Sequence, residues 1–185
     1  MALNSIPVVA IDLTKPPEEL VIDLINHDNG TQLTSAQLSF GIPELSNNIH
    51  NTRILATAKP NSHLRGSVSI SYNRIDIGAI PNGRSTTFPI TTEQKVSDLV
   101  PAIDAAYSLK LTPNDYIDGP LPTLPHGTGQ MGSVDLVASP NSLVFINKLS
   151  LSLDRPGILL SDIMTNLVLR GLNYISPTPP VYYGY

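Results

Sequence analysis

Two short stretches of the chain alternate between hydrophobic and polar residues. Residues 66–74 read Gly-Ser-Val-Ser-Ile-Ser-Tyr-Asn-Arg, and residues 147–155 read Asn-Lys-Leu-Ser-Leu-Ser-Leu-Asp-Arg. Successive side chains of a strand point to opposite faces, so each stretch predicts a β-strand with one buried face, the serines lying on the other. The apolar residues expected to be buried are Val68, Ile70, Leu149, Leu151 and Leu153.

A helical pattern precedes the first of these strands. Thr14 is the expected N-cap, because prolines and acidic residues follow it and both suit a first helical turn. Gly30 is the expected end, since glycine readily adopts the left-handed conformation of a C-cap. A short apolar run at residues 6–13 predicts a strand before the helix. The apolar face of the helix comprises Leu20, Val21, Leu24 and Ile25.

A second helical pattern precedes the second strand. Thr91, with Gln94 three residues later, resembles a capping box. Pro101 lies inside the pattern and is expected to kink the helix or delay its start. The residues that share one face of this helix are Val96, Leu99, Val100, Ile103 and Tyr107.

The helices and strands recur in the same order, with collinear matches between the two halves. Residues 33–37 match residues 111–115 at an offset of 78, and the Pro-Asn-Ser turns at residues 60–62 and 140–142 match at an offset of 80. Small insertions produce such a slowly growing offset. We therefore predict an α+β protein of two tandem related units, each strand-helix-strand-hairpin-strand, with an extended C-terminal arm. The units are residues 1–83 and 84–175, and the arm is residues 176–185.

The strand pattern and the alignment of the two units predict where single residues should lie. The first serine-rich strand should break near residues 73–74, because its apolar residues occupy even positions whereas Ile75 and Ile77 occupy odd ones. Corresponding residues should lie in the same kind of element. The pairs are Ile25 with Ile103, Pro60 with Pro140 and Ile70 with Leu151.

Composition narrows the classes of function. Charged residues make up 14% of the chain, well below the roughly 25% typical of soluble domains. The net charge of -4 argues against a surface that neutralises phosphates. The chain has no cysteine, which excludes disulfides and thiolate metal sites. We expect no signal peptide and no membrane span, since no long apolar run is present.

No pattern predicts catalysis or a bound cofactor. Residues 127–132 fit Gly-x-Gly-x-x-Gly, but that motif binds dinucleotides where it opens a helix, and here it leads into a predicted strand. The four histidines lack metal-ligand spacing. Asp115 and Asp118 are near one another, but paired acids need a cleft to gain a perturbed pKa. We therefore expect no enzyme, no catalytic residue, no cofactor and no metal.

Arg74 and Arg155 stand at matching places in the two units. Two interpretations are open for these arginines. Each could bind an acidic partner, or each could pair as a strand-end charge within its own unit.

Two short motifs stand out, Tyr-Asn-Arg-Ile-Asp at residues 72–76 and Leu-Thr-x-x-Asp at residues 111–115. Through these motifs, the stretch of residues 16–154 resembles a group of virion structural proteins from large tailed bacteriophages. The second unit departs from the first motif at residues 153–155, which read Leu-Asp-Arg. The resemblance implies a non-enzymatic virion component, assembled in the host cytoplasm. Its implied partners are copies of itself and other virion proteins, with no nucleic acid, membrane or small-molecule substrate.

The end of the chain is rich in proline and tyrosine. Prolines prevent a helix over residues 176–185, and tyrosine gains contact area at low entropic cost. We expect this segment to lie as an arm on another subunit; an unstructured aromatic end is the alternative. The alternative function is an extracellular adhesion or carbohydrate-binding module, which the absence of tryptophan disfavours. The expected interface residues are Val181, Tyr182, Tyr183 and Tyr185.

Overall fold

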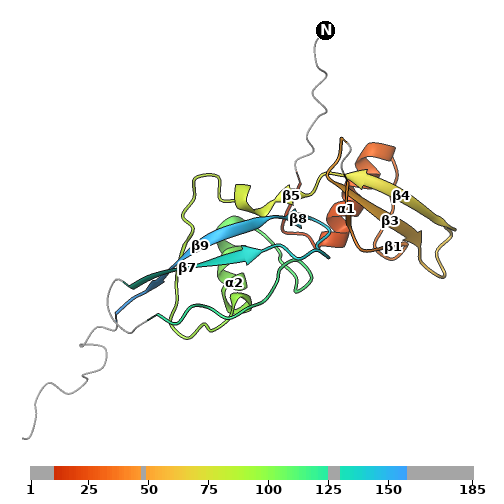
Figure 1. Ribbon diagram of the computed structural model, residues 1–185. Helices are drawn as coiled ribbons and strands as arrows, with labels where there is room; N and C mark the ends of the chain where they lie inside the picture. The colour runs from red at the N-terminus through yellow and green to blue at the C-terminus, as the bar shows by residue number, and fades with distance from the viewer. Residues whose placement is uncertain (1–10, 47–48, 125–129, 158–185) are drawn as a thin grey trace, which may run out of the picture.

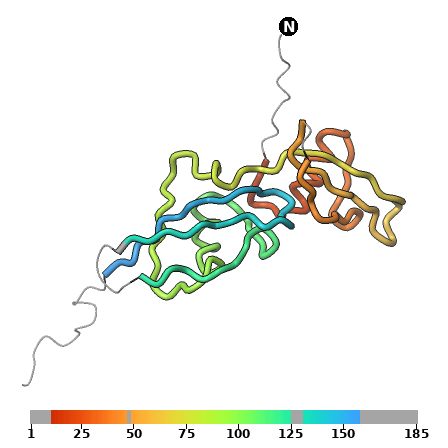
Figure 2. The backbone as a smooth tube through the Cα atoms, viewed as in Figure 1, coloured from red at the N-terminus to blue at the C-terminus, as the bar shows by residue number. Residues whose placement is uncertain are grey.

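The protein is an α+β chain of two lobes joined by a short parallel ladder (Figures 1 and 2). The computed structural model describes residues 11–46, 49–124 and 130–157. Most of the strand expected at residues 6–13 falls outside these ranges, and its described end, residues 11–13, is not in a strand. The expected arm also lies outside the described residues, together with Val181, Tyr182, Tyr183 and Tyr185.

The described elements divide between the two lobes. The first lobe contains α1 (Pro17–Asn29), β1 (Leu38–Phe40), β2 (Glu44–Leu45), β3 (Thr52–Ala58) and β4 (Ser67–Tyr72). Between the lobes lie β5 (Ile75–Asp76), the 3-10 helix η1 (Ile77–Ala79) and β8 (Phe145–Ile146). The second lobe contains β6 (Thr87–Pro89), α2 (Val96–Tyr107), β7 (Gln130–Val137) and β9 (Lys148–Arg155).

The first sheet is centred on β3. The neighbouring strand β4 pairs with it in antiparallel orientation, and β1 and β2 pair with successive parts of it. The turn expected at residues 60–62 joins β3 to β4. Regular structure stops after Tyr72 and resumes as β5 at Ile75, so the break expected near residues 73–74 is confirmed.

The second sheet has the order β6-β9-β7. The long strands β7 and β9 are antiparallel, whereas β6 runs parallel to β9 with Phe88 opposite Leu153. The turn at residues 140–142 follows β7 and leads to β8. That strand pairs in parallel with β5, Ile75 lying opposite Phe145. This ladder connects the first lobe to the second.

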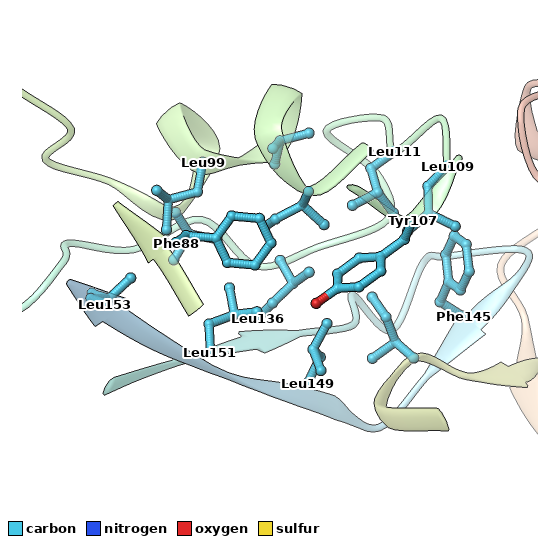
Figure 3. Close-up of a cluster of buried hydrophobic side chains, with 14 of the residues drawn as sticks. Phe88, Leu99, Tyr107, Leu109, Leu111, Leu136, Phe145, Leu149, Leu151 and Leu153 are labelled. Carbon is cyan, nitrogen blue, oxygen red and sulfur yellow. The ribbon is translucent and has the colours of Figure 1, made fainter. Parts of the chain in front are cut away.

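The main hydrophobic core lies in the second lobe, between α2 and the sheet (Figure 3). Phe88 packs edge-on against Tyr107, with ring centroids 6.1 Å apart and an interplanar angle of 73°. The predicted apolar face of α2 is confirmed, because every member is buried. These residues are Val96, Leu99, Val100, Ile103 and Tyr107.

The first lobe has a much smaller core. Its buried cluster consists of Val21, Ile54 and Tyr72, with Leu24 and Ile70 only partly covered. The predicted face of α1 therefore contributes to the core, but less deeply than the face of α2.

The two alternating strands differ in burial. Leu149, Leu151 and Leu153 are buried as predicted, at 3%, 1% and 0% exposure. Val68 was expected to be buried and is 60% exposed, so that prediction is wrong. The reason is that the small cluster of the first lobe extends along β4 only as far as Ile70. The serines between these residues are exposed or half-buried.

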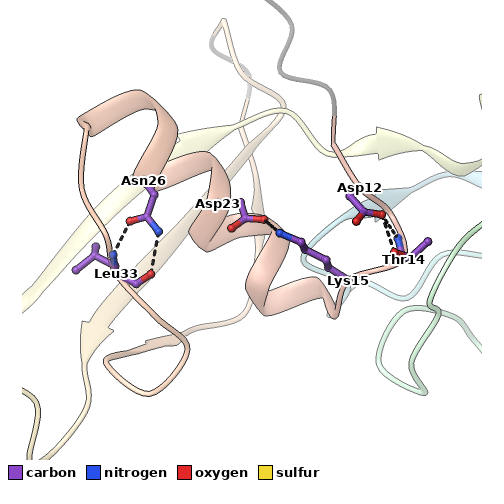
Figure 4. A network of polar contacts seen from close by, with 6 residues as sticks. All are labelled: Asp12, Thr14, Lys15, Asp23, Asn26 and Leu33. Atoms are coloured by element: carbon purple, nitrogen blue, oxygen red, sulfur yellow. Dashed lines mark hydrogen bonds and ion pairs between the residues drawn. The ribbon is translucent and has the colours of Figure 1, made fainter.

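The predicted start of the first helix is wrong, whereas its predicted end is confirmed. Thr14 donates through its backbone N and Oγ1 to Asp12 Oδ1, at 3.1 and 2.6 Å, and lies before the helix (Figure 4). The helix starts at Pro17, with the extended Pro16 in the N-cap place. Proline fixes φ and suits the first helical position, and here it sets the start. Gly30 is the C-cap, with φ of 62°.

The predicted cap of the second helix is also wrong. Thr91 donates to Glu93 Oε2 instead of capping the helix. Asp98 accepts from the backbone N of Gln94 and of Lys95, at 2.8 and 2.9 Å. These hydrogen bonds lower the pKa of the Asp98 carboxyl. The helix begins at Val96, so Pro101 does not delay its start.

The loop after each helix is held by a side chain at a matching position. Asn26 Oδ1 accepts from Leu33 N at 2.7 Å, and Asn26 Nδ2 donates to Leu33 O at 2.8 Å (Figure 4). In the second lobe Asp104 accepts from Leu111 N at 3.1 Å. An ionised carboxylate has no N–H, so it cannot donate to Leu111 O. Burial raises the pKa of the Asp104 carboxyl.

Replacing Asp104 with asparagine is expected to stabilise the protein by about 0.5–1.5 kcal/mol at neutral pH. The amide can supply the second hydrogen bond that Asn26 makes, and the substitution removes a charge that burial disfavours. Because the pKa of Asp104 is raised on folding, wild-type stability falls as pH rises through the folded-state pKa. Asp104→Asn should therefore gain more at pH 7 than at pH 3 in urea unfolding. Asn26→Asp is the matched control and should destabilise; no gain from Asp104→Asn at pH 7 would refute the prediction.

Candidate functional site

A buried arginine lies where the two lobes meet. Arg74 is 7% exposed. Its Nε donates to Thr52 Oγ1 at 2.8 Å, and its Nη1 donates to Ser142 O at 2.9 Å and, at 3.5 Å, to Pro140 O. In the described part of the chain no ion pair involves Arg74. Burial lowers the pKa of its guanidinium group. Neutral oxygens from both lobes thus hold this side chain.

All five residues of the motif at residues 72–76 make contacts at this junction. Asn73 Oδ1 accepts from Asn51 N at 2.8 Å, within the first lobe. Burial raises the pKa of the Tyr72 hydroxyl, which donates to the second lobe. The motif therefore clamps the segment after the 140–142 turn. Besides those of Arg74, the contacts across the lobes are Tyr72 Oη to Leu143 O (2.6 Å), Ile75 N to Val144 O (2.7 Å) and Asn147 Nδ2 to Asp76 Oδ2 (2.9 Å).

The motif at residues 111–115 shapes the other side of the junction. Asp115 and Ser142 are 1% and 0% exposed. Ser142 Oγ donates to Asp115 Oδ1 at 2.7 Å and accepts from Phe145 N at 3.0 Å. Asp115 Oδ2 accepts from the backbone N and Oγ1 of Thr112, at 2.9 and 2.6 Å. This network fixes the turn whose carbonyl oxygens accept from Arg74.

Arg74 and Arg155 occupy matching positions in the two units but have different hydrogen-bond partners. Arg74 contacts both its own lobe and the other one. Arg155 stays within the second lobe, where it donates to Leu124 O at 2.8 Å and to Thr91 O at 3.4 Å. Pairing within its own unit therefore describes Arg155 but only part of what Arg74 does.

Asp115 and Asp118 do not converge on one site. Asp118 Oδ1 accepts from Ser97 N at 2.9 Å, at the start of α2, and this bond is the main cause of its lowered pKa. Asp115 instead points into the junction, where it accepts from Ser142. The two carboxylates thus have separate structural contacts.

The other candidate motifs also stay apart from the junction. Of residues 127–132, the described part begins at residue 130 and belongs to β7, not to a helix. Among the described residues, no group of three or more His, Cys, Asp or Glu side chains could hold a metal ion. Within the same ranges, neither helix combines the length and apolar character required to cross a membrane.

An open groove of about 510 Å³ lies beside the junction and is lined by both lobes. The first lobe contributes Glu18, from the start of α1, and Phe40 and Ile42, from the end of β1 and the loop after it. The second lobe contributes Asp115 and Leu143. The groove thus combines apolar and acidic side chains.

Three exposed apolar side chains lie close together in sequence, and the first of them, Ile42, lines this groove. Ile42, Leu45 and Ile49 are 71%, 80% and 90% exposed. None of these three residues was predicted as an interface residue from the sequence. The available signal was that they are large apolar residues in a stretch that belonged to none of the predicted elements.

The fold and the junction define an α+β protein of two lobes held together by a buried polar network. The chain belongs to DUF7941, a family of unknown function, which matches residues 11–181. No curated protein and no solved structure matches the chain.

Proposed function

We propose that this protein is a non-enzymatic structural component of a tailed-phage virion that assembles through subunit interfaces. Its proposed partners are copies of itself and other virion proteins, and the proposed place of assembly is the host cytoplasm. This role involves no nucleic acid, membrane or small-molecule substrate. Of the motifs that resemble phage virion proteins, the one at residues 72–76 binds the other lobe, and the one at residues 111–115 fixes the turn whose carbonyl oxygens accept from Arg74. A fixed arrangement of lobes suits a building block of a particle.

The observation that carries the assembly role is the exposure of three large apolar side chains, those of Ile42, Leu45 and Ile49. Burying apolar surface is favourable, and concentrations of exposed apolar side chains commonly mark interaction sites. Ile42, Leu45 and Ile49 are three of the most exposed large apolar residues in the described chain. We infer that they meet another subunit, together with the C-terminal arm at Val181, Tyr182, Tyr183 and Tyr185.

We further propose that residues 1–83 and 84–175 are copies of one unit, followed by the arm at residues 176–185. Both hairpins close in the same way, which supports this proposal. Ala58 N donates to Gly66 O at 3.0 Å, and Ala138 N donates to Asn147 O at 2.9 Å. The two acceptor residues both have positive φ, 85° for Gly66 and 65° for Asn147.

Further matches support the same alignment. The loops after the two helices contain equivalent turns, in which Thr34 N donates to Gln37 Oε1 and Thr112 N donates to Asp115 Oδ2, both at 2.9 Å. Each of the aligned residue pairs lies in one kind of element: Ile25 and Ile103 in helices, Pro60 and Pro140 in turns, and Ile70 and Leu151 in strands.

Replacing Leu45 and Ile49 together with asparagine is expected to reduce self-assembly without unfolding the protein. Both side chains are at least 80% exposed, so the substitutions remove little of the core. Sedimentation velocity should give a smaller species than wild type, with an unchanged far-UV circular dichroism spectrum. Ile117→Asn, which alters a residue 52% exposed in the second lobe, is the matched control and should assemble normally. Assembly of the double variant at wild-type level would refute the role of Leu45 and Ile49 in self-assembly.

A further inference from the structure

The outer edge of β4 has no strand partner within the described ranges. This strand pairs with β3 alone, and Ser69 and Ser71 on it are exposed. A free strand edge presents backbone N–H and C=O groups that can accept another strand. The edge is therefore a candidate site for an extended segment.

The second lobe carries a strand at the corresponding edge. There β6 lies parallel to β9, with Phe88 opposite Leu153. Phe88 and Ile90 are 5% and 4% exposed and form part of the core. One hydrogen bond flanks each end of this ladder: Ser152 N to Thr86 O (2.9 Å) and Ile90 N to Asp154 O (2.8 Å).

Among its described residues, the first lobe has no counterpart of β6, which adds apolar side chains to the core of the second lobe. Leu24 and Ile70 stay half-buried beside the small cluster around Tyr72. Ile11 lies at one end of this face and lines a shallow apolar pocket with Leu24, Tyr72 and Asn73. When the helix starts at Pro17 and Val96 are aligned, at an offset of 79, Ile11 corresponds to Ile90.

We propose that the free edge of β4 binds residues 6–10 of its own chain as a parallel strand. These residues read Ile-Pro-Val-Val-Ala and directly precede Ile11, which already lies beside Asn73. The register follows from that of β6 on β9. It places Val8 opposite Ser71, Val9 opposite Tyr72 and Ala10 opposite Asn73. The inference rests on the correspondence of the two units proposed above, but not on a role in a virion.

The residue types at positions 6–10 are compatible with the positions that this register gives them. Pro7 corresponds to Thr86, whose carbonyl oxygen accepts from β9, and proline retains its carbonyl. Ala10 corresponds to Pro89, which has no N–H to give to β9. Val9 corresponds to the buried Phe88 and would cover the half-buried face of the first lobe. Alternate residues of a parallel ladder bond to the neighbouring strand, so Val9 should donate to β4.

Cysteine cross-linking tests this register, because the chain has no cysteine of its own. Val8→Cys with Ser71→Cys should form a disulfide within one chain, seen on a non-reducing gel and by mass spectrometry of the linked peptides. Val8→Cys with Ser69→Cys is the matched control, since a shift of two residues exceeds the roughly 7 Å reach of a disulfide. We expect the first pair to oxidise at least about tenfold faster. Equal rates, or cross-links between two chains, would overturn the proposal.

Hydrogen exchange at the amide of Ser71 provides a second test in the full chain. Val9→Pro removes the donor that should bind β4, so exchange should accelerate by about tenfold or more. Ala10→Pro is the matched control, because β6 carries proline at that place, and should leave exchange unchanged. Unchanged exchange in Val9→Pro would overturn the proposal. Neither outcome bears on self-assembly, which sedimentation measures separately.

Discussion

Replacing Arg74 with methionine is expected to lower the free energy of unfolding by about 2–4 kcal/mol. Methionine keeps an apolar stem but removes the N–H groups that donate to Thr52 Oγ1 and Ser142 O. A buried oxygen that loses its donor costs about 1–3 kcal/mol, and removal of the buried charge offsets part of this cost. Urea unfolding of both proteins at pH 7 measures the difference.

Arg155→Met is the matched control for this prediction. Arg155 is half-buried, and its hydrogen bonds stay within one lobe. Its loss is expected to cost less than about 1 kcal/mol. Equal costs for the two substitutions would contradict the conclusion that the buried arginine clamps the lobes together.

Truncation of Leu151 to alanine is expected to destabilise the protein by about 2–5 kcal/mol. The side chain is 1% exposed and lies on β9, facing the core beneath α2 (Figure 3). Its removal loses apolar contacts and leaves a cavity that the packed surroundings fill only in part. Thermal and urea unfolding both report the loss.

Val68→Ala is the control, because Val68 belongs to the same alternating pattern in the first lobe but is 60% exposed. Its cost should stay within about 0.5 kcal/mol. Ile70→Ala, at the position that corresponds to Leu151, should fall between the two, since Ile70 is half-buried. A cost for Val68→Ala close to that of Leu151→Ala would show that exposure does not explain the difference between the lobes.

The alternating pattern predicted the strands correctly but not the depth to which each is buried. Val68 and Leu149 stand at matching places in similar sequences, yet one is exposed and the other buried. Burial depends on what other elements place over a strand. In the second lobe α2 covers the sheet and the edge strand β6 adds Phe88 to the core, whereas the described first lobe offers α1 alone.

The junction was only half predictable from sequence. The motifs at residues 72–76 and 111–115 were identified as features of the chain, but their partners were not. Arg74 binds a backbone carbonyl 68 positions away in sequence. Every residue has a carbonyl, so no side-chain pattern indicates which one accepts. The predicted starts of both helices were wrong for a local reason. Hydroxyl residues usually cap helices, but here Pro17 sets the start of the first helix and Asp98 accepts the backbone hydrogen bonds at the start of the second.

The most direct test of the proposed assembly role is sedimentation velocity of the full chain and of a chain that lacks residues 181–185. The full chain is expected to form a discrete oligomer. If residues 181–185 form contacts between subunits, as proposed, and none within the fold, the shortened chain should sediment as a smaller species while its circular dichroism spectrum and unfolding temperature stay unchanged. A full chain that remains monomeric at all concentrations would contradict the assembly role, and an oligomer that persists unchanged in the shortened chain would contradict the role of the arm.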